Sequence, residues 1–312
     1  MYPWLIATHW SDTLSESLNT TAPIKIVKRC LKQQLRIGTT YPIPTFIVLA
    51  IFAQITYVSW RQNTALHAFA YLISVWLGIL ATDVVVASWP RSGIGFPIRH
   101  GAWGETVLIL SSTLLGALFL GIRFSHYWPG VQGIPKLALL SLLVFTFPIF
   151  LAFVYACFYR YRPGELGFNF HYWYLALVIV VLFGAVTLAA VPQLSHWRSY
   201  FHSLGFLRAL YTGLITAGLA EEFTRMLTQT RLTAALHNRG WGFLLAAIIW
   251  SLLHVPVNLS QAAHISLPVV LIQSTHLVPI GLLWGYMTHR TQSILPSTLA
   301  HGLNLWGLQN GI

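Results

Sequence analysis

Long apolar runs separated by short polar segments recur along most of the chain. A helix needs about 20 residues to cross the hydrocarbon core of a bilayer, and many of these runs approach that length. Nine spans are predicted, near residues 44–60, 65–88, 106–122, 136–158, 172–191, 205–229, 242–258, 267–288 and 293–309. One of the shorter runs is a candidate re-entrant segment. The pattern therefore predicts an all-α, polytopic integral membrane protein with about 8–9 transmembrane helices. Pro148 and Pro256 lie within runs and are expected to kink them.

Composition excludes a soluble globular domain. Of the 312 residues, 56% are hydrophobic and 8% are charged, whereas a soluble domain carries about 25% charged residues. The chain has two cysteines, Cys30 and Cys157. They are too few for a disulfide framework, and both are expected to be reduced.

Basic residues cluster near the amino terminus, within residues 1–42, at Lys25, Lys28, Arg29, Lys32 and Arg36. Two interpretations fit this cluster. One is a short amphipathic helix lying on an anionic leaflet. The other, which the charge pattern favours, is a cytoplasmic flank that follows the positive-inside rule.

The distribution of lysine and arginine predicts the orientation. With the amino terminus in the cytoplasm, twelve of the 18 Lys and Arg residues fall in inside segments, five fall outside, and Arg225 lies within a span. This bias predicts a cytoplasmic amino terminus. It also accounts for most of the net charge of +11, so no nucleic-acid partner is needed to explain that charge.

The segment Ala220–Arg225 places two adjacent carboxylates and an arginine inside an otherwise apolar run. The whole chain has only seven acidic residues, and Glu221 and Glu222 are two of them. An ionisable group within a membrane span is a functional hypothesis by default. The alternative is a structural pair between Glu221 and Arg225, which are four residues apart on one helical face.

Two later apolar runs also carry polar side chains. Trp250 and His254 lie four residues apart in one run, and His301 and Asn304 lie three residues apart in the last. A carboxylate, two imidazoles and a carboxamide from separate helices are together sufficient to activate a water molecule and stabilise an oxyanion.

These three segments resemble the motifs of the CPBP intramembrane proteases, the group that includes the CAAX prenyl endopeptidases. The connecting stretches 281–286 and 290–296 are similar too, as is Arg162–Phe168 upstream. The resemblance covers roughly residues 160–310. It predicts a catalytic transmembrane core over 161–312, preceded by a basic cytoplasmic segment (1–42) and by transmembrane helices of unassigned role (43–160).

The resemblance and the chemistry of the side chains imply the same roles. Glu221 is the expected general base, and His254 is expected to share the activated water. His301 and Asn304 would donate hydrogen bonds to the oxyanion. Glu222, Arg225 and Trp250 are expected to support the site, with Glu222 orienting Arg225. A zinc ion held by Glu221, His254 and His301 is an alternative arrangement.

Three positions depart from the family pattern. Two residues, where the family usually has three, separate Glu222 from Arg225; Trp250 replaces the usual Phe; and Asn304 follows His301 by three residues instead of four. The shortened first motif keeps open an inactive membrane scaffold. A proton-coupled transporter, with Asp83 and Glu221 in a relay, is a third class. For a protease, the expected partners are a membrane-associated peptide or protein substrate and the lipid bilayer.

Overall fold

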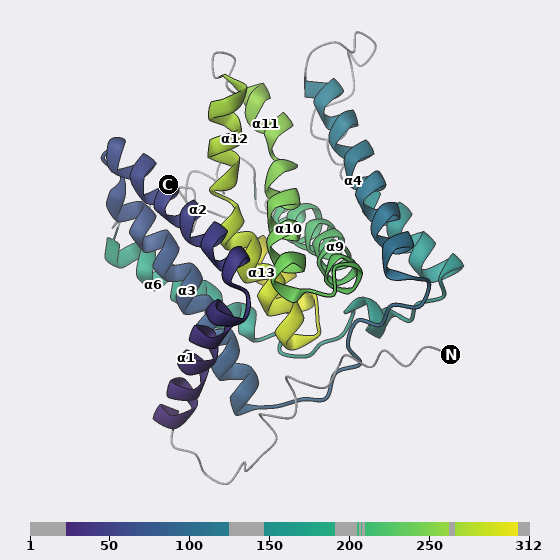
Figure 1. The fold of residues 1–312 in the computed structure, drawn as a ribbon, viewed down its shortest axis with the longest axis horizontal. Helices are drawn as coiled ribbons and strands as arrows, with labels where there is room; N and C mark the ends of the chain where they lie inside the picture. Colours follow the sequence, from purple (N-terminus) through teal and green to yellow (C-terminus); the bar gives the residue numbers. More distant parts are fainter. Residues whose placement is uncertain are drawn as a thin grey trace.

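Every regular element that the structure describes is helical (Figure 1). The computed structural model describes residues 23–124, 147–190, 205, 207, 210–261 and 266–304. The elements are α1 (Pro23–Thr40), α2 (Pro42–Arg61), α3 (Ala65–Ser88), α4 (Ala102–Phe124), η1 (Val154–Phe158), η2 (Pro163–Leu166), α6 (Leu175–Ala190), η3 (Tyr211–Glu221), α9 (Glu222–Ala235), α10 (Arg239–Leu252), α11 (Val255–Gln261), α12 (Leu267–Thr275), α13 (Val278–Thr291) and α14 (Leu295–Asn304). Here η1 and η3 are π-helical, whereas η2 is a 3-10 turn.

Three of the described helices are long and apolar enough to cross a membrane: α2, α3, and α12 joined with α13 over Leu267–Thr291. Four apolar helical segments are shorter, at Ala102–Leu118, Phe147–Phe158, Leu175–Ala190 and Arg239–Leu252. The all-α membrane architecture is thus confirmed. The total of eight or nine spans stays a prediction, and parts of the predicted spans 136–158, 205–229 and 293–309 lie outside the described residues.

The basic leader forms a helix from Pro23 to Thr40. Cys30 faces the protein and is buried, and the Gln34 amide donates a hydrogen bond of 3.1 Å to Asp83 on α3. Cys157 is exposed, and both cysteines are free as expected. Asp83 also accepts hydrogen bonds from Tyr286 and Arg290 of α13. α1 is therefore held against the end of α3.

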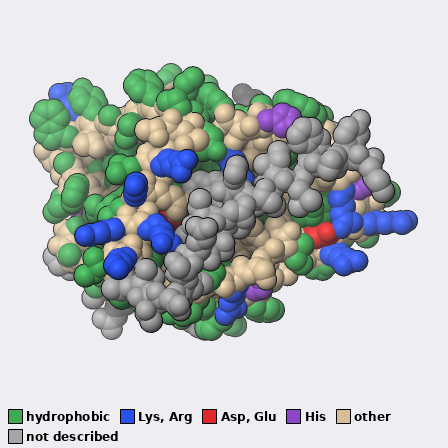
Figure 2. Space-filling view, turned by 60° about the horizontal axis from the view of Figure 1, so that its bottom comes forward, with side chains coloured by type: hydrophobic (Ala, Val, Ile, Leu, Met, Phe, Trp, Pro, Cys, Tyr) green, Lys and Arg blue, Asp and Glu red, His purple; other side chains and the backbone are tan. Residues whose placement is uncertain are grey.

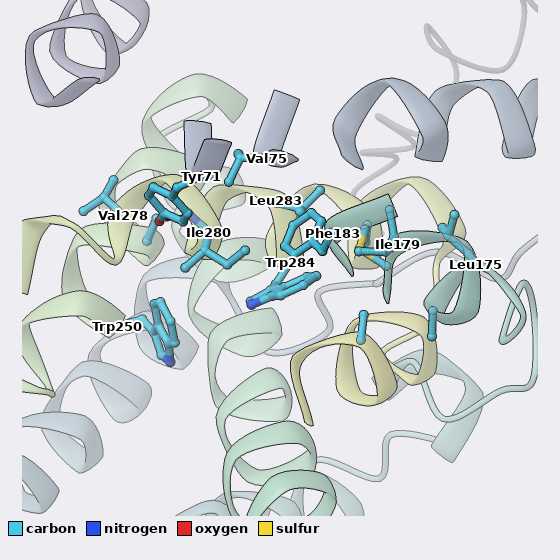
Figure 3. Packing of buried hydrophobic residues seen from close by; sticks show 14 of the residues in the cluster. Tyr71, Val75, Leu175, Ile179, Phe183, Trp250, Val278, Ile280, Leu283 and Trp284 are labelled. Atoms are coloured by element: carbon cyan, nitrogen blue, oxygen red, sulfur yellow. Dashed lines mark hydrogen bonds between the residues drawn. The ribbon is translucent and has the colours of Figure 1, made fainter. Parts of the chain in front are cut away.

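Two apolar clusters flank α9. The larger joins α3, α6, α10 and α13, with Trp284 fully buried at its centre (Figure 3). The smaller joins α4 and η1 to Phe223, Met226 and Leu227 of α9. In Figure 1, α9 and α10 accordingly lie between α4 on one side and the α2, α3 and α6 group on the other.

α9 is buried although its sequence is polar, because neighbouring helices bind its polar atoms. Arg225 donates to the carbonyl oxygen of Gly281 at 2.9 Å, and Gln229 donates to that of Gly285 at 3.2 Å. On another side of α9, Arg231 pairs with Glu105 of α4 at 2.8 Å. These contacts satisfy polar groups that lipid could not hydrogen-bond.

Glycines allow η3 and α14 to approach closely. A Cβ on Gly302 would lie 2.7 Å from the carbonyl oxygen of Gly213, and a Cβ on Gly218 would lie 2.5 Å from that of Thr298. Such small residues let membrane helices pack at short range. The contact places α14 against the end of the helix that carries Glu221.

The segment resembling the one upstream of the family core positions the start of α14. The Gly167 carbonyl accepts from the Ile294 amide at 3.0 Å, and the Asn169 amide donates to the Gln292 carbonyl at 2.7 Å. Gly167 has a φ of 78°, a conformation that glycine adopts without strain. This turn therefore anchors the helix that bears His301.

Candidate functional site

Four helical elements bring the predicted residues together. Glu221 is the last residue of η3, and Glu222 is the first of α9. Trp250 lies in α10, and His301 lies in α14. His254 sits in the short break between α10 and α11, so the expected interruption next to Pro256 is confirmed.

Glu221 presents its carboxylate to two other motifs. The indole Nε1 of Trp250 donates a hydrogen bond to Oε2 of Glu221 at 2.6 Å. Nε2 of His301 lies 4.0 Å from the same oxygen. That separation is too long for a direct hydrogen bond, but one water molecule can contact both atoms. The Glu221 side chain is 26% exposed.

Glu222 has a different environment, because its side chain is only 1% exposed. Its Oε1 pairs with Arg225 and lies 2.8 Å from Nδ1 of His301. A proton on Nδ1 donated to this carboxylate leaves Nε2 directed towards Glu221. Glu222 therefore orients both Arg225 and His301, whereas its expected contact was with Arg225 or nearby backbone.

Glu221 is distinguished from the other acidic side chains by its partner. Five acidic residues lie in the described part of the chain, and four of them pair with an arginine: Asp83 with Arg290, Glu105 with Arg231, Glu165 with Arg99, and Glu222 with Arg225. Glu221 instead accepts from the neutral indole. The structural alternative, a Glu221–Arg225 pair, is replaced by the Glu222–Arg225 pair.

Besides Glu221, Trp250 contacts Arg225, His254 and His301. Its ring lies 4.9 Å from the Arg225 guanidinium and 4.9 Å from the His254 ring, and its carbonyl oxygen is 3.1 Å from Nδ1 of His254. The His301 ring lies 5.6 Å away. In Figure 3 the indole nitrogen of Trp250 points away from the other labelled core side chains. The residue thus joins the apolar core to the polar site.

A cavity of about 240 Å³ opens beside Glu221, between α4, α10 and the junction of η3 with α9. Glu221, Trp250 and His254 line it, and most of its remaining wall is apolar. Two buried hydroxyls in the wall, of Thr113 and Thr216, have no hydrogen-bond partner among the described residues. The cavity can therefore receive a largely apolar chain with a few polar backbone groups.

Within the described residues, Asn304 makes no hydrogen bond to another residue of the site. It is 3% exposed, and its Oδ1 has no hydrogen-bond partner in the described part of the chain. It lies one turn after His301 and is the last described residue of α14. Neither Asn304 nor His301 lines the cavity.

A zinc ion held by Glu221, His254 and His301 was the alternative arrangement for this site. Within the described residues, no three His, Cys, Asp or Glu side chains lie close enough together to hold a metal ion. Glu221, His254 and His301 are therefore not brought together in this structure as the three protein ligands of a catalytic zinc site.

Two features of the site were not predicted from the sequence: the part of the cavity wall that comes from α4 and the ring that packs on His301. α4 supplies Ser112, Thr113, Gly116 and Ala117 to the cavity wall, and Trp284 stacks on the His301 ring at 5.8 Å. The small residues of α4 recur at spacings of four, which is the pattern that allows close helix approach in membranes. That spacing is the signal that could have identified α4.

A comparison with known protein families gave a match, which covers the part of the chain that holds the site. Residues 202–306 match the family model described as type II CAAX prenyl endopeptidase Rce1-like. This part of the chain is similar to the CAAX-protease-like family. The matched region runs from the segment before η3 through α14, so it includes every predicted site residue. Searches of curated proteins and of solved structures gave no match. The apolar helices and this similarity together indicate a membrane protein, and the matched family is one of proteases.

Proposed function

We propose that this protein is an intramembrane endopeptidase that hydrolyses a peptide bond with a water molecule activated by Glu221. The observation that carries the proposal is the position of the Glu221 carboxylate and the partners that surround it. It faces a cavity, its Oε2 lies 4.0 Å from Nε2 of His301, and among the described residues it forms no ion pair with an arginine within 4.0 Å, although Arg225 also lines the cavity. A carboxylate already paired with arginine, as Glu222 is, would be a weaker base.

The chemistry follows from these positions. Water held between Oε2 of Glu221 and Nε2 of His301 gives a proton to Glu221, and its oxygen attacks the carbonyl carbon of the scissile bond. The proton then passes to the departing amine nitrogen. His254, at the cavity wall, holds the second hydrogen bond of the water. Trp250 fixes the rotamer of Glu221, since its indole N–H binds one carboxylate oxygen.

The oxyanion is assigned to His301 and Asn304. In the reacting form His301 carries a proton on both ring nitrogens before the water attacks: Nδ1–H donates to the Glu222 carboxylate. Nε2–H donates first to the water oxygen and then to the developing oxyanion, so no proton passes through His301 during the step. The Asn304 amide would add a second donor. Glu222 and Arg225 act through His301, as positioning residues.

The substrate we infer is a membrane-associated peptide or protein segment, entering the apolar cavity between α4 and α10. The name of the matched family makes a prenylated carboxyl-terminal peptide the first candidate to test. We infer a cytoplasmic amino terminus from the distribution of Lys and Arg.

Replacement of Glu221 by Gln tests the proposal. The protein is reconstituted in liposomes with a library of membrane-anchored peptides, prenylated and not, and new amino termini are identified by mass spectrometry. We expect the native chain to cleave a subset of peptides and Glu221→Gln to cleave none while keeping its melting temperature.

A matched variant separates chemistry from folding. Glu222→Gln removes the adjacent carboxylate and should lower the melting temperature, because it leaves Arg225 buried without its partner. Cleavage by Glu221→Gln at the native rate would refute the role of Glu221. No cleavage by the native chain of any peptide would favour the inactive scaffold.

A further inference from the structure

All five basic residues of α1 lie on one helical face. Their spacings of three, one, three and four residues confine them to a stripe about 100° wide. The five side chains are exposed: Lys25, Lys28, Arg29, Lys32 and Arg36. Figure 2 shows lysine and arginine side chains gathered on the face that includes the lower side of Figure 1, where α1 lies. The helix sequence contains no acidic residue.

The protein holds this stripe outward. Cys30 is buried, and Gln34, four residues later on the same face, donates to Asp83 of α3. That face is roughly opposite the basic stripe, since Cys30 and Gln34 are about 140–180° away from Lys25 around the helix. α1 therefore cannot turn its basic side towards α3 without losing these contacts.

Beside the basic stripe runs an exposed apolar edge. Ile24 is 70% exposed and Leu35 is 76% exposed. They are eleven residues apart, which places them on the same side of an α-helix, and Leu31 lies between them. A basic face next to exposed aliphatic side chains is the arrangement of helices that lie in the interface of a membrane.

The chain connection keeps α1 at the membrane surface. Only Tyr41 separates the end of α1 from the start of α2 at Pro42. α2 is one of the helices long and apolar enough to cross a bilayer. The carboxyl-terminal end of α1 is thus within a few ångströms of the point where the chain enters the membrane.

We propose that α1 is a binding site for anionic phospholipid headgroups of the bilayer that contains the protein. The basic stripe would contact phosphate groups, and Ile24 and Leu35 would lie among the upper acyl chains. A flank that only sets orientation needs positive charge on one side of the membrane. It needs neither a single helical face nor an adjacent apolar edge.

A fluorescent label at position 35 tests this site in the full chain. Leu35→Cys is made together with Cys157→Ser, which leaves Cys30 buried, and an environment-sensitive dye is attached. The protein is placed in lipid nanodiscs of phosphatidylcholine, with or without phosphatidylglycerol. Access of acrylamide, a neutral water-soluble quencher, is then measured at low and high salt.

Protection of the dye from acrylamide should require phosphatidylglycerol and should decrease at high salt, since salt screens exposed charges. Each Lys or Arg near an anionic surface contributes about fivefold to membrane partition. Lys28→Gln with Lys32→Gln should therefore lower the ratio of protected to accessible dye about twenty-five-fold.

The control variant removes two positive charges that lie outside α1. Arg61 and Arg160 are exposed and lie outside α1, so Arg61→Gln with Arg160→Gln should leave the protection unchanged. Equal protection with and without phosphatidylglycerol would overturn the proposal, as would equal losses in the two double variants. Protection that rises with the number of protein copies per disc, in either lipid, would instead indicate that a second chain covers α1.

Discussion

Replacing Trp250 with Phe isolates one hydrogen bond of the proposed site. The substitution removes the indole N–H that donates to Oε2 of Glu221 at 2.6 Å. A phenyl ring stays in place against Arg225, His254 and His301, all of which lie within 5.6 Å of the present ring. The main chemical change is therefore the loss of the donor that fixes the general base.

The size of the effect follows from the charge on the acceptor. A hydrogen bond to a charged group contributes about 1.5–3 kcal/mol. If Trp250 acts on Glu221 during the reaction, the turnover rate should fall about tenfold to a hundredfold, at 1.36 kcal/mol per factor of ten. The apolar contacts of the ring are mostly kept, so the melting temperature in detergent should change less than in the matched variant.

Trp284→Phe is that matched variant. Trp284 is fully buried, it stacks on the other face of the site at His301, and its Nε1 has no partner among the described residues. The same change of side chain there deletes no hydrogen bond seen in the structure and leaves a void in the centre of the core. We expect a larger loss of stability and a smaller loss of turnover than for Trp250→Phe. Equal losses of turnover in the two variants would refute the positioning role of the Trp250 N–H.

Three further substitutions test the supporting structure. Asn304→Ala should lower turnover about a hundredfold or more if the amide is an oxyanion donor, and a loss below about threefold would assign Asn304 to packing. Arg225→Ala should lower the melting temperature in detergent, because breaking a buried pair costs about 3–5 kcal/mol; an unchanged melting temperature would contradict the Glu222–Arg225 contact. Gly302→Ala places a methyl group against the Gly213 carbonyl and should cost about 1–3 kcal/mol of stability while shifting His301, so differential scanning fluorimetry and turnover should both respond.

The apolar pattern predicted the outer helices well. The expected spans at 44–60 and 65–88 correspond to α2 (Pro42–Arg61) and α3 (Ala65–Ser88). Both helices are long, uninterrupted apolar stretches, so length and hydropathy are enough to locate them. The break beside His254 followed from Pro256, whose ring cannot be accommodated within a regular helix.

The inner helix was harder to anticipate. α9 contains Glu222, Arg225, Gln229 and Arg231, and all four are buried. Its stability depends on acceptors from α4 and α13, which are distant in sequence, such as Glu105 and the Gly281 carbonyl. Hydropathy describes how favourably each residue alone enters an apolar environment, and it contains no information on hydrogen-bonding partners from other helices. The π-helical form of η3, directly before Glu221, likewise has no signature that a pattern of apolar positions would reveal.

The sequence motifs identified the site residues, but they did not show which side chains contact one another. Trp250 was expected as a supporting aromatic, but the donor atom that distinguishes it from Phe acquires its role only when α10 places it next to Glu221. His301 was expected near Glu221, and the structure adds Glu222 on the opposite ring nitrogen. Spacing along one helix predicts which residues share a face. It does not determine which atom of a ring faces which carboxylate.

The geometry also bears on the shortened first motif, which was the main support for an inactive scaffold. With three intervening residues, an arginine would be the i,i+4 neighbour of the second glutamate. With two, Arg225 is the i,i+3 neighbour of Glu222. Both spacings lie on one helical face. The structure shows that pair, and Glu221 keeps the carboxylate that faces the cavity. The shortened motif therefore still allows the arginine to pair with the second glutamate, and the Glu221 carboxylate stays at the cavity, as the proposed mechanism needs.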